Sequence, residues 1–332
     1  MKSSYYSHGK FLLTGEYLVL KGTLALALPL RLGQTLSVET FPETSQKTIR
    51  ETFRETSLQW EAHKPEGKWF SVTLNRENLV NFSTDDPDKA LRLAQILQSV
   101  KQLNPKAFEG SDLRFTTRLD FDPNWGLGSS STLIANLARW ADVNPYELLK
   151  RTFGGSGYDI ACATAEQPIY YQIKAEVPEP AVPEQCRRIE GPTPNVESVD
   201  FNPPFADHLF FVYQGQKQSS SKEIKTFLEK ANPADLQKDM EAVSEISRAV
   251  PQCESLDEFC MLMQCHERII ARCIGQEPVQ KRFPDFEGVL KSLGAWGGDF
   301  ILAATEWDES QVRDYFKGKG LEVIFKYDNL VL

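Results

Sequence analysis

The first third of the chain alternates between short apolar runs and polar or turn-forming breaks. The runs cover residues 10–20, 24–30, 35–40, 58–61 and 69–74, and Gly, Pro or charged residues separate them. Short apolar runs bounded in this way are typical of β-strands. The pattern therefore predicts a β-rich opening.

A different period begins at residue 85. Between residues 85 and 103 the apolar positions recur at helical spacing, and Asp86-Pro87 supplies a helix start signal. A strand is predicted at 113–119, followed by a turn rich in Gly and Ser and by a second helix. The apolar positions of these two helices are Ala90, Leu93, Ala94, Leu97, Val100, Leu133, Ile134, Leu137 and Ala138.

Proline concentrates between residues 174 and 208. This stretch holds seven of the 19 prolines and few apolar runs, which is typical of a boundary between domains. We therefore predict an N-terminal domain at 1–185 and a C-terminal domain at 205–332. Beyond the boundary the periodicity predicts an α+β half, with strands at 208–213, 298–305 and 321–325 and helices at 222–230, 235–250, 256–274 and 310–316.

Composition limits the function classes. The chain has 332 residues, 41% hydrophobic and 25% charged, which is ordinary for a globular protein of one large or two smaller domains. Its formal net charge of −9 opposes a nucleic-acid partner, because neutralising a phosphate backbone needs a concentrated basic surface. One small anionic ligand stays compatible with this charge.

No targeting or membrane segment is expected. The first ten residues lack the cationic and apolar segments of a signal peptide, and no uncharged apolar stretch approaches the roughly 20 residues of a membrane helix. We expect a cytoplasmic protein, either a monomer or a homodimer, that acts on a small molecule. The six cysteines show no paired C-x-x-C spacing, so we expect reduced thiols and no structural zinc.

The most informative segment is the turn at residues 123–131, with the sequence PNWGLGSSS. Glycines before a helix let the backbone approach a ligand, and the first N–H groups of the helix face any bound anion. The turn is therefore a candidate phosphate site formed by Gly126, Leu127, Gly128, Ser129, Ser130 and Ser131. A serine cap on an ordinary helix is the alternative. The nucleotide loop G-x-x-x-x-G-K-[ST], the dinucleotide fingerprint and the hydrolase elbow are all absent.

Three separated motifs give the chain a resemblance to the GHMP kinases, a family of small-molecule kinases. Residues 126–131 resemble the family's G-L-G-S-S nucleotide loop, and residues 9–20 resemble the N-terminal motif of its mevalonate-pathway members. Residues 291–299 resemble its C-terminal glycine motif, with Trp296 at a position where the family has glycine. The resemblance spans nearly the whole chain.

The resemblance implies an α+β fold of two domains. The N-terminal domain would be of the ribosomal-protein-S5 type and the C-terminal domain ferredoxin-like. It also implies that the chain is an enzyme, an ATP-dependent phosphotransferase, with ATP and Mg²⁺ as cofactors. In that family the Gly/Ser loop at residues 126–131 holds the nucleotide.

Catalytic residues follow from the same resemblance. Phosphoryl transfer requires positioning of the acceptor, neutralisation of phosphate charge and, for a hydroxyl acceptor, removal of a proton. Asp159 resembles the family's catalytic aspartate, as a base or as the group that orients the acceptor, and Lys10 is its expected partner. Ser130 and Glu147 are the candidate Mg²⁺ ligands. The alternatives are a helix cap for Asp159, a solvated lysine and a solvent-facing glutamate.

The candidate substrate-binding residues lie in or beside the motifs. They are Glu16, Tyr17, Ser156, Ser220, Lys222, Trp296, Gly297 and Asp299. Ser220 and Lys222 belong to a Ser-rich stretch similar to one beside the substrate of phosphomevalonate kinases, and a polar loop that caps the next helix is the alternative.

The first and third motifs look closer to phosphomevalonate kinase than to galactokinase or homoserine kinase. The substrate predicted from this likeness is phosphomevalonate, whose phosphate would accept the phosphoryl group. Mevalonate kinase is the first alternative, and diphosphomevalonate decarboxylase shares the fold. A binding protein without turnover is a further alternative, because an indole at Trp296 replaces a glycine.

Overall fold

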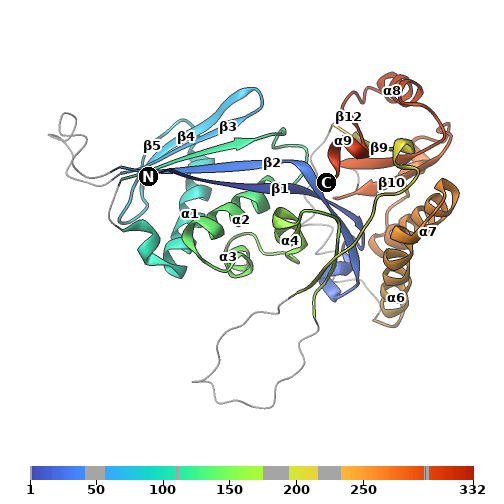
Figure 1. Cartoon of the computed structure of the whole chain (residues 1–332), viewed down its shortest axis with the longest axis horizontal. Coiled ribbons are helices and arrows are strands. Elements are labelled where there is room, and N and C mark those ends of the chain that lie inside the picture. The colour runs from blue at the N-terminus through green and yellow to red at the C-terminus, as the bar shows by residue number, and fades with distance from the viewer. Residues whose placement is uncertain are drawn as a thin grey trace, which may run out of the picture. The chain divides into compact units, whose positions relative to one another are not determined.

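The computed structural model describes residues 2–41, 57–109, 112–174, 194–215, 233–294, 296 and 299–332. Two compact units make up the chain (Figure 1). The first comprises Met1–Gly9, Leu32–Pro123 and Gly128–Thr164, and the second comprises Lys10–Arg31, Asn124–Leu127 and Ala165–Leu332. Each unit is therefore built from segments that are distant in sequence.

The first unit is built on a mixed sheet. Its strands are β3 (Ser57–Lys64), β4 (Gly67–Asn75), β5 (Asn81–Thr84) and β6 (Asp112–Leu119), with parts of β1 (Lys2–Thr14) and β2 (Ala25–Phe41). The order is β5-β4-β3-β6-β2, and β1 pairs with β2. β3 and β6 are parallel, whereas β4 with β5 and β2 with β6 are antiparallel. Burial alternates along β6, as a period of two requires when one face is packed.

Helices cover one face of this sheet (Figure 1). They are α1 (Pro87–Leu103), α2 (Ser129–Ala141), α3 (Pro145–Thr152) and α4 (Tyr158–Thr164). α1 begins as its sequence predicts, because the Asp86 side chain accepts a hydrogen bond from the Lys89 N–H and Pro87 occupies the first helical position. One hydrophobic core joins the apolar faces of the strands to α1, α2, α3 and α4.

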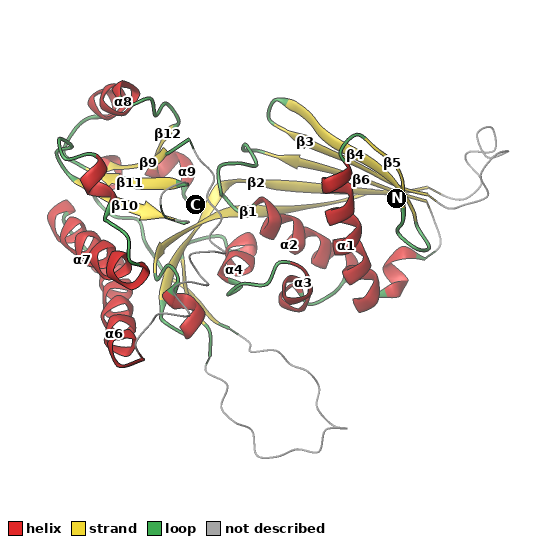
Figure 2. Cartoon of the chain, turned by 180° about the vertical axis from the view of Figure 1, so that it is seen from behind, coloured by secondary structure: helices red, strands yellow, loops and turns green. Residues whose placement is uncertain are grey.

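The second unit holds an antiparallel sheet of order β10-β11-β9-β12. The chain runs through β9 (Leu209–Tyr213), α6 (Pro233–Ala249), α7 (Leu256–Ile274), β10 (Val289–Leu293), β11 (Phe300–Ala304), α8 (Glu309–Gly318), β12 (Ile324–Lys326) and α9 (Tyr327–Leu330). This alternation and strand order are those of a ferredoxin-like unit. Figure 2 shows α6 and α7 side by side in it. In the same unit the start of β2 pairs with β7 (Ile169–Gln172), which pairs with β8 (Asn195–Ser198).

The predicted two-domain α+β fold is confirmed. The helix expected at 256–274 occupies those residues, from the Ser255 cap to a left-handed Gly275. The strand at Val289–Leu293 was not predicted. The helix expected at 222–230 lies outside the described residues, as does the end of the first predicted domain at residue 185, so the boundaries 1–185 and 205–332 stay a prediction.

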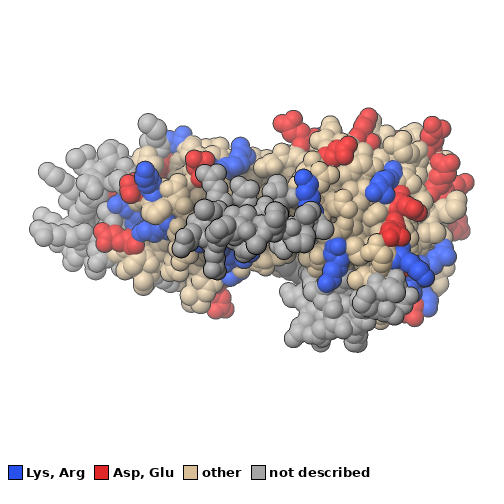
Figure 3. Space-filling model, turned by 90° about the horizontal axis from the view of Figure 1, so that it is seen from below, with Lys and Arg blue, Asp and Glu red and all other residues tan. Residues whose placement is uncertain are grey.

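The face of the molecule seen in Figure 3 carries charges of both signs. In the view of Figure 3, Asp and Glu side chains are interspersed with Lys and Arg, so the visible part offers no broad basic area. None of the helices described is long and apolar enough to cross a bilayer. Within the same residues, Cys162, Cys253, Cys260, Cys265 and Cys273 are free thiols. Burial raises the pKa of Cys253 and of Cys260 to about 11, so both thiols stay protonated at neutral pH.

Candidate functional site

The Gly/Ser turn leads directly into α2. Gly126 and Gly128 have φ angles of 73° and 96°, in the left-handed region that favours glycine. Gly128 stands at the cap position and has no side chain with which to satisfy the first N–H groups of the helix. The Ser130 side chain is exposed, whereas the Ser131 hydroxyl is buried and donates to the Gly128 carbonyl at 2.9 Å. The open N–H groups and Ser130 therefore face outward, and Ser131 closes the turn.

A chain of buried hydrogen bonds fixes α2 against the sheet. Thr132 Oγ1 donates to Gln34 Oε1 at 3.0 Å, and Asn136 Nδ2 donates to the Gln34 carbonyl at 2.8 Å. Ser7 Oγ donates to Asn136 Oδ1 at 2.9 Å. Because all four residues are buried, each bond is shielded from water. The start of α2 is thus held on a rigid support.

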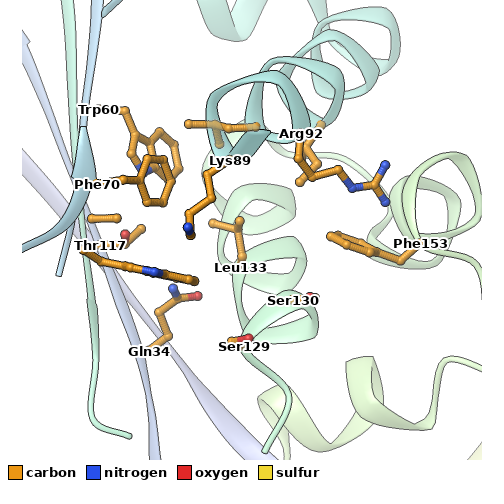
Figure 4. A pocket seen from close by; sticks show the side chains of 14 residues that line it. Gln34, Trp60, Phe70, Lys89, Arg92, Thr117, Ser129, Ser130, Leu133 and Phe153 are labelled. Atoms are coloured by element: carbon orange, nitrogen blue, oxygen red, sulfur yellow. The ribbon is translucent and has the colours of Figure 1, made fainter. Parts of the chain in front are cut away.

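A cavity of about 160 Å³ opens beside the start of α2 in the first unit (Figure 4). The sheet forms one wall with Trp60, Phe70 and Thr117, and Ser129 and Ser130 lie at one end. The other residues that line it are Gln34, Ala62, Trp69, Lys89, Arg92, Leu93, Ile96, Leu133 and Phe153. An aromatic wall with hydroxyl and N–H donors at one end suits a flat ring joined to a polar group.

Two cations of α1 border this cavity. The Lys89 ammonium pairs with the Asp86 carboxylate and lies 5.6 Å from the centre of the Trp69 ring. The Arg92 guanidinium lies 4.3 Å from the centre of the Phe153 ring and donates to the Thr152 carbonyl at 2.9 Å. Cation–π contacts of this kind orient long side chains. The cavity therefore combines apolar walls with oriented positive charge.

The residues just before α2 belong to the second unit and are firmly anchored there. Trp125 packs against the rings of Tyr213, Phe300 and Phe325, with ring centres 5.4 to 6.4 Å apart. Tyr213 Oη donates to the Asn124 carbonyl at 3.2 Å. The backbone N–H of Lys10 donates to the Leu127 carbonyl at 3.0 Å, so the first and second sequence motifs meet here.

Glu16 and Tyr17 are buried in the second unit. Glu16 is 3% exposed and contacts the Lys291 ammonium, which is itself 1% exposed. Tyr17 has a left-handed φ of 63°, which is rare for a residue with a side chain, and its hydroxyl accepts a hydrogen bond from the Trp296 N–H at 3.3 Å. The first and third motifs are thus joined by two buried contacts.

Two further groups of α7 complete the cluster around Glu16. His266 Nε2 lies 3.3 Å from Glu16 Oε2 and accepts the Gly15 N–H at 2.9 Å. Burial holds the pKa of His266 well below its usual value, so the ring is neutral. Glu267 accepts hydrogen bonds from Ser292 Oγ at 3.0 Å and Ser292 N at 3.1 Å. Burial raises the pKa of Glu16 to about 7, against the opposing pull of Lys291.

Trp296 is 3% exposed and belongs to a hydrophobic core. Its partners there are Tyr17, Leu18, Val243, Ile270 and Ala271. This placement gives the indole a packing role. A role as the wall of an acceptor site stays a prediction that burial does not favour.

Asp159 lies in the first turn of α4, after a tight glycine turn. Gly154, Gly155 and Gly157 have φ angles of 66°, 104° and 87°, and they flank Ser156. The Asp159 side chain accepts the Ile160 N–H at 3.1 Å. Burial, followed by the charge of Asp159, raises the pKa of Tyr146 to about 12. Asp159 is half-buried, so part of this residue is accessible to solvent.

The predicted site residues thus fall in both units. Ser129, Ser130, Glu147, Ser156 and Asp159 belong to the first unit, and Lys10, Glu16, Tyr17, Gly126, Leu127, Trp296 and Asp299 belong to the second. Ser220, Lys222 and Gly297 lie outside the described residues. Glu147 is in the first turn of α3, where its N–H donates to Asn144 Oδ1 at 3.2 Å. Among the residues that the structure describes, no group of three or more Asp, Glu, His or Cys side chains is placed to hold a metal ion on its own.

Sequence reasoning missed the lining of the cavity. Gln34, Trp60, Lys89, Arg92 and Phe153 come from β2, β3, α1 and the end of α3. No local motif connects them, because the sheet and helices bring them together only in the folded chain. The available signal was the density of aromatic residues in 60–70, which the period of two assigns to strands without showing what they face.

Comparisons with solved structures identify the fold. The chain superposes on a mevalonate kinase from Methanococcus jannaschii with a TM-score of 0.67 at 13% identity, covering 98% of this chain and 97% of that one. A phosphomevalonate kinase from Streptococcus pneumoniae, in complex with phosphomevalonate and AMPPNP, gives 0.66 at 16% identity, with coverage of 98% and 99%. A galactokinase from Lactococcus lactis, complexed with galactose, gives 0.61 at 10% identity, with coverage of 98% and 92%.

No model of a known protein family matches the sequence, and no curated protein sequence matches it. The three solved structures named above nevertheless align over nearly the whole chain, and all three are GHMP kinases. The resemblance derived from the three motifs is therefore confirmed at the level of the fold.

Proposed function

We propose that the chain is an ATP-dependent kinase of a small metabolite, with phosphomevalonate as the acceptor. One observation carries the proposal: the start of α2, with no capping side chain and with Ser130 exposed, lies at the end of a cavity walled by aromatic residues. A nucleotide matches both parts of this site, because its flat base suits the aromatic walls and its anionic phosphates suit the start of the helix.

ATP fits the chemistry of the site. The base would lie among Trp60, Trp69 and Phe70, and the phosphates would take N–H donors at Ser129 and Ser130. Lys89 and Arg92 add positive charge at the cavity, although Lys89 is partly neutralised by Asp86. The anchoring of α2 by Gln34 and Asn136 means that these donors need little rearrangement on binding.

Mg²⁺ also fits the residues present. This ion is bound mainly through one or two protein oxygens together with substrate phosphates, so a dedicated acidic cluster is not required. The Ser130 hydroxyl and the Glu147 carboxylate would hold it, and it would neutralise phosphate charge.

The proposed reaction forms a bond between an acceptor oxygen and the γ-phosphorus and breaks the bond from that phosphorus to the β,γ-bridging oxygen, releasing ADP. Asp159 would orient the acceptor, or take its proton if the acceptor is a hydroxyl. Lys10 would stabilise the transferring charge.

The motifs support phosphomevalonate as the acceptor, because the first and third look closer to those of phosphomevalonate kinase than to those of galactokinase or homoserine kinase. A solved phosphomevalonate kinase with phosphomevalonate bound aligns over 98% of this chain, and a solved mevalonate kinase aligns over the same share. Mevalonate kinase, diphosphomevalonate decarboxylase and a binding protein without turnover are the alternatives.

One assay tests the proposal. The purified chain is incubated with Mg-ATP and, separately, with phosphomevalonate, mevalonate, homoserine and galactose while ADP release is measured. We expect ADP release with phosphomevalonate and a loss of ATP use in Ser130→Ala but not in Ser99→Ala, a matched change on α1. ADP release with mevalonate alone would show that mevalonate, and not phosphomevalonate, is the acceptor. Nucleotide binding without acceptor-dependent ADP release would show a binding protein without turnover.

A further inference from the structure

Asp299 lies immediately before β11 and places its carboxylate against two glycine backbones of the second unit. A Cβ atom on Gly126 would lie 2.6 Å from Asp299 Cγ, and a Cβ atom on Gly294 would lie 2.8 Å from Asp299 Oδ2. Both distances are shorter than real carbon contacts. The carboxylate therefore fills the space that side chains at these two positions would need.

Space and backbone conformation are separate requirements at these glycines. Gly126 and Gly294 both have a φ of 73°, which already favours glycine. Gly275, in the same unit, has a φ of 70°, and a Cβ atom added there would meet nothing within 4 Å. Gly275 therefore isolates the conformational cost, and any further cost at Gly126 measures the contact with Asp299.

The carboxylate stands on a rigid support. Asp299 is 8% exposed, and its carbonyl accepts the Gln214 N–H at 2.9 Å. The next residue, Phe300, pairs with Tyr213 of β9 and with Leu293 of β10 in the sheet. Groups held by a sheet keep their position better than groups on loops.

The Gly/Ser turn is held in the second unit by contacts on both sides of Gly126. Trp125 is held among three aromatic rings, and the Leu127 carbonyl accepts the Lys10 N–H. Gly126 lies between these two residues and packs on Asp299. Two residues later the chain enters α2, whose N–H groups are the proposed phosphate donors.

We propose that Asp299 is a positioning residue of the nucleotide loop, whose carboxylate sets the path by which residues 126–128 enter α2. This inference rests on the proposed function and deepens it, because it moves Asp299 from acceptor binding to ATP binding. A carboxylate repels phosphate, so Asp299 acts through the Gly126 backbone and not by touching the nucleotide.

The first test separates ATP binding from acceptor binding. We expect Asp299→Ala to weaken Mg-AMPPNP binding about tenfold, equal to about 1.4 kcal/mol, with the acceptor KM unchanged. Asp299→Asn, which keeps the size of the group, should retain most of the affinity. Equal losses for ATP and acceptor, or a raised acceptor KM alone, would return Asp299 to the acceptor site and overturn the inference.

The second test measures the contact itself through thermal unfolding. We expect Gly126→Ala to lower Tm more than Gly275→Ala, since both variants bear the conformational cost and only the first meets Asp299. In Gly126→Ala/Asp299→Ala the loss should be smaller than the sum of the two single losses. Additive losses would show that the carboxylate does not position Gly126. If Asp299→Ala folds poorly, the comparison of Gly126→Ala with Gly275→Ala decides the matter, because equal Tm losses in these two variants would show no contact with Asp299.

The two proposals fail in different ways. Absence of Mg-AMPPNP binding to the unmodified chain would overturn the proposed function, whatever the unfolding cycle shows. Binding to the unmodified chain that persists unchanged in Asp299→Ala would overturn the role of Asp299 and leave the proposed function standing.

Discussion

Two buried carboxylates lie near one ammonium group in the second unit. Glu16 contacts Lys291 directly, and the charge of Lys291 also acts on Glu267. His266 is neutral, so two ionised carboxylates would leave one uncompensated negative charge in the core. Binding a proton removes that charge, which explains why burial raises the pKa of Glu16 to about 7.

This arrangement makes stability depend on pH. Because the pKa of Glu16 is raised from 4.5 to about 7 on folding, its contribution is fully present below pH 4.5 and is lost as the pH rises through 7. Glu16→Gln removes this titration. We expect the unfolding free energy of the variant, relative to the unmodified chain, to improve by up to about 2 kcal/mol between pH 5.5 and pH 8.

Denaturant unfolding across this pH range provides the measurement. Exposed Glu245→Gln serves as the control and should follow the unmodified chain at every pH. A constant difference between Glu16→Gln and the unmodified chain would show that Glu16 keeps one protonation state throughout.

Asp159 carries the second prediction at this scale. We expect Asp159→Asn to lower kcat by about 10² to 10⁴ while the KM for ATP stays unchanged, because orienting or deprotonating the acceptor acts in the transition state. The size of the loss also reports on the acceptor. A phosphate oxygen is mostly deprotonated at neutral pH and needs no base, so a phosphate acceptor should give the smaller loss. Steady-state kinetics decides this, and normal turnover would leave Asp159 as a helix cap.

At the scale of elements, the sequence predicted those features that residues close together in the chain determine. Helix α7 was predicted at its observed bounds because a serine cap, an apolar stripe and a terminal glycine all act within a few residues. The strand β10 was missed, since Lys291 and Ser292 interrupt its apolar run although both are buried. Their polar groups are satisfied by Glu16 and Glu267, which are distant in sequence.

The candidate site also has one part that neighbouring residues determine and one part that distant segments form. The turn into α2 was predicted because glycine conformation and open N–H groups are local properties. The aromatic cavity beside it was not, because its walls come from strands and helices that meet only after folding. Glu16 and Trp296 were predicted to bind substrate because both lie in the family motifs. Their burial was not predicted, because a residue's type in the sequence does not show which distant residues pack around it in the folded chain.

At the scale of the molecule, both units share strands. Residues 2–9 of β1 and 32–41 of β2 belong to the first unit, while residues 10–14 and 25–31 of the same strands belong to the second. The segment Asn124–Leu127 also belongs to the second unit, whereas α2, which follows it, belongs to the first. Unfolding one unit therefore disturbs strands whose other ends support the core of its neighbour.

This continuity predicts a single cooperative unfolding transition. Phe115 and Phe211 are fully buried in the first and second unit, and truncating a buried phenylalanine costs about 3–5 kcal/mol. We expect Phe115→Ala and Phe211→Ala each to shift the same calorimetric peak to lower temperature, with calorimetric and van't Hoff enthalpies equal. Two peaks, with each variant moving only one of them, would show that the shared strands can come apart at the unit boundary and that the two cores are stable independently.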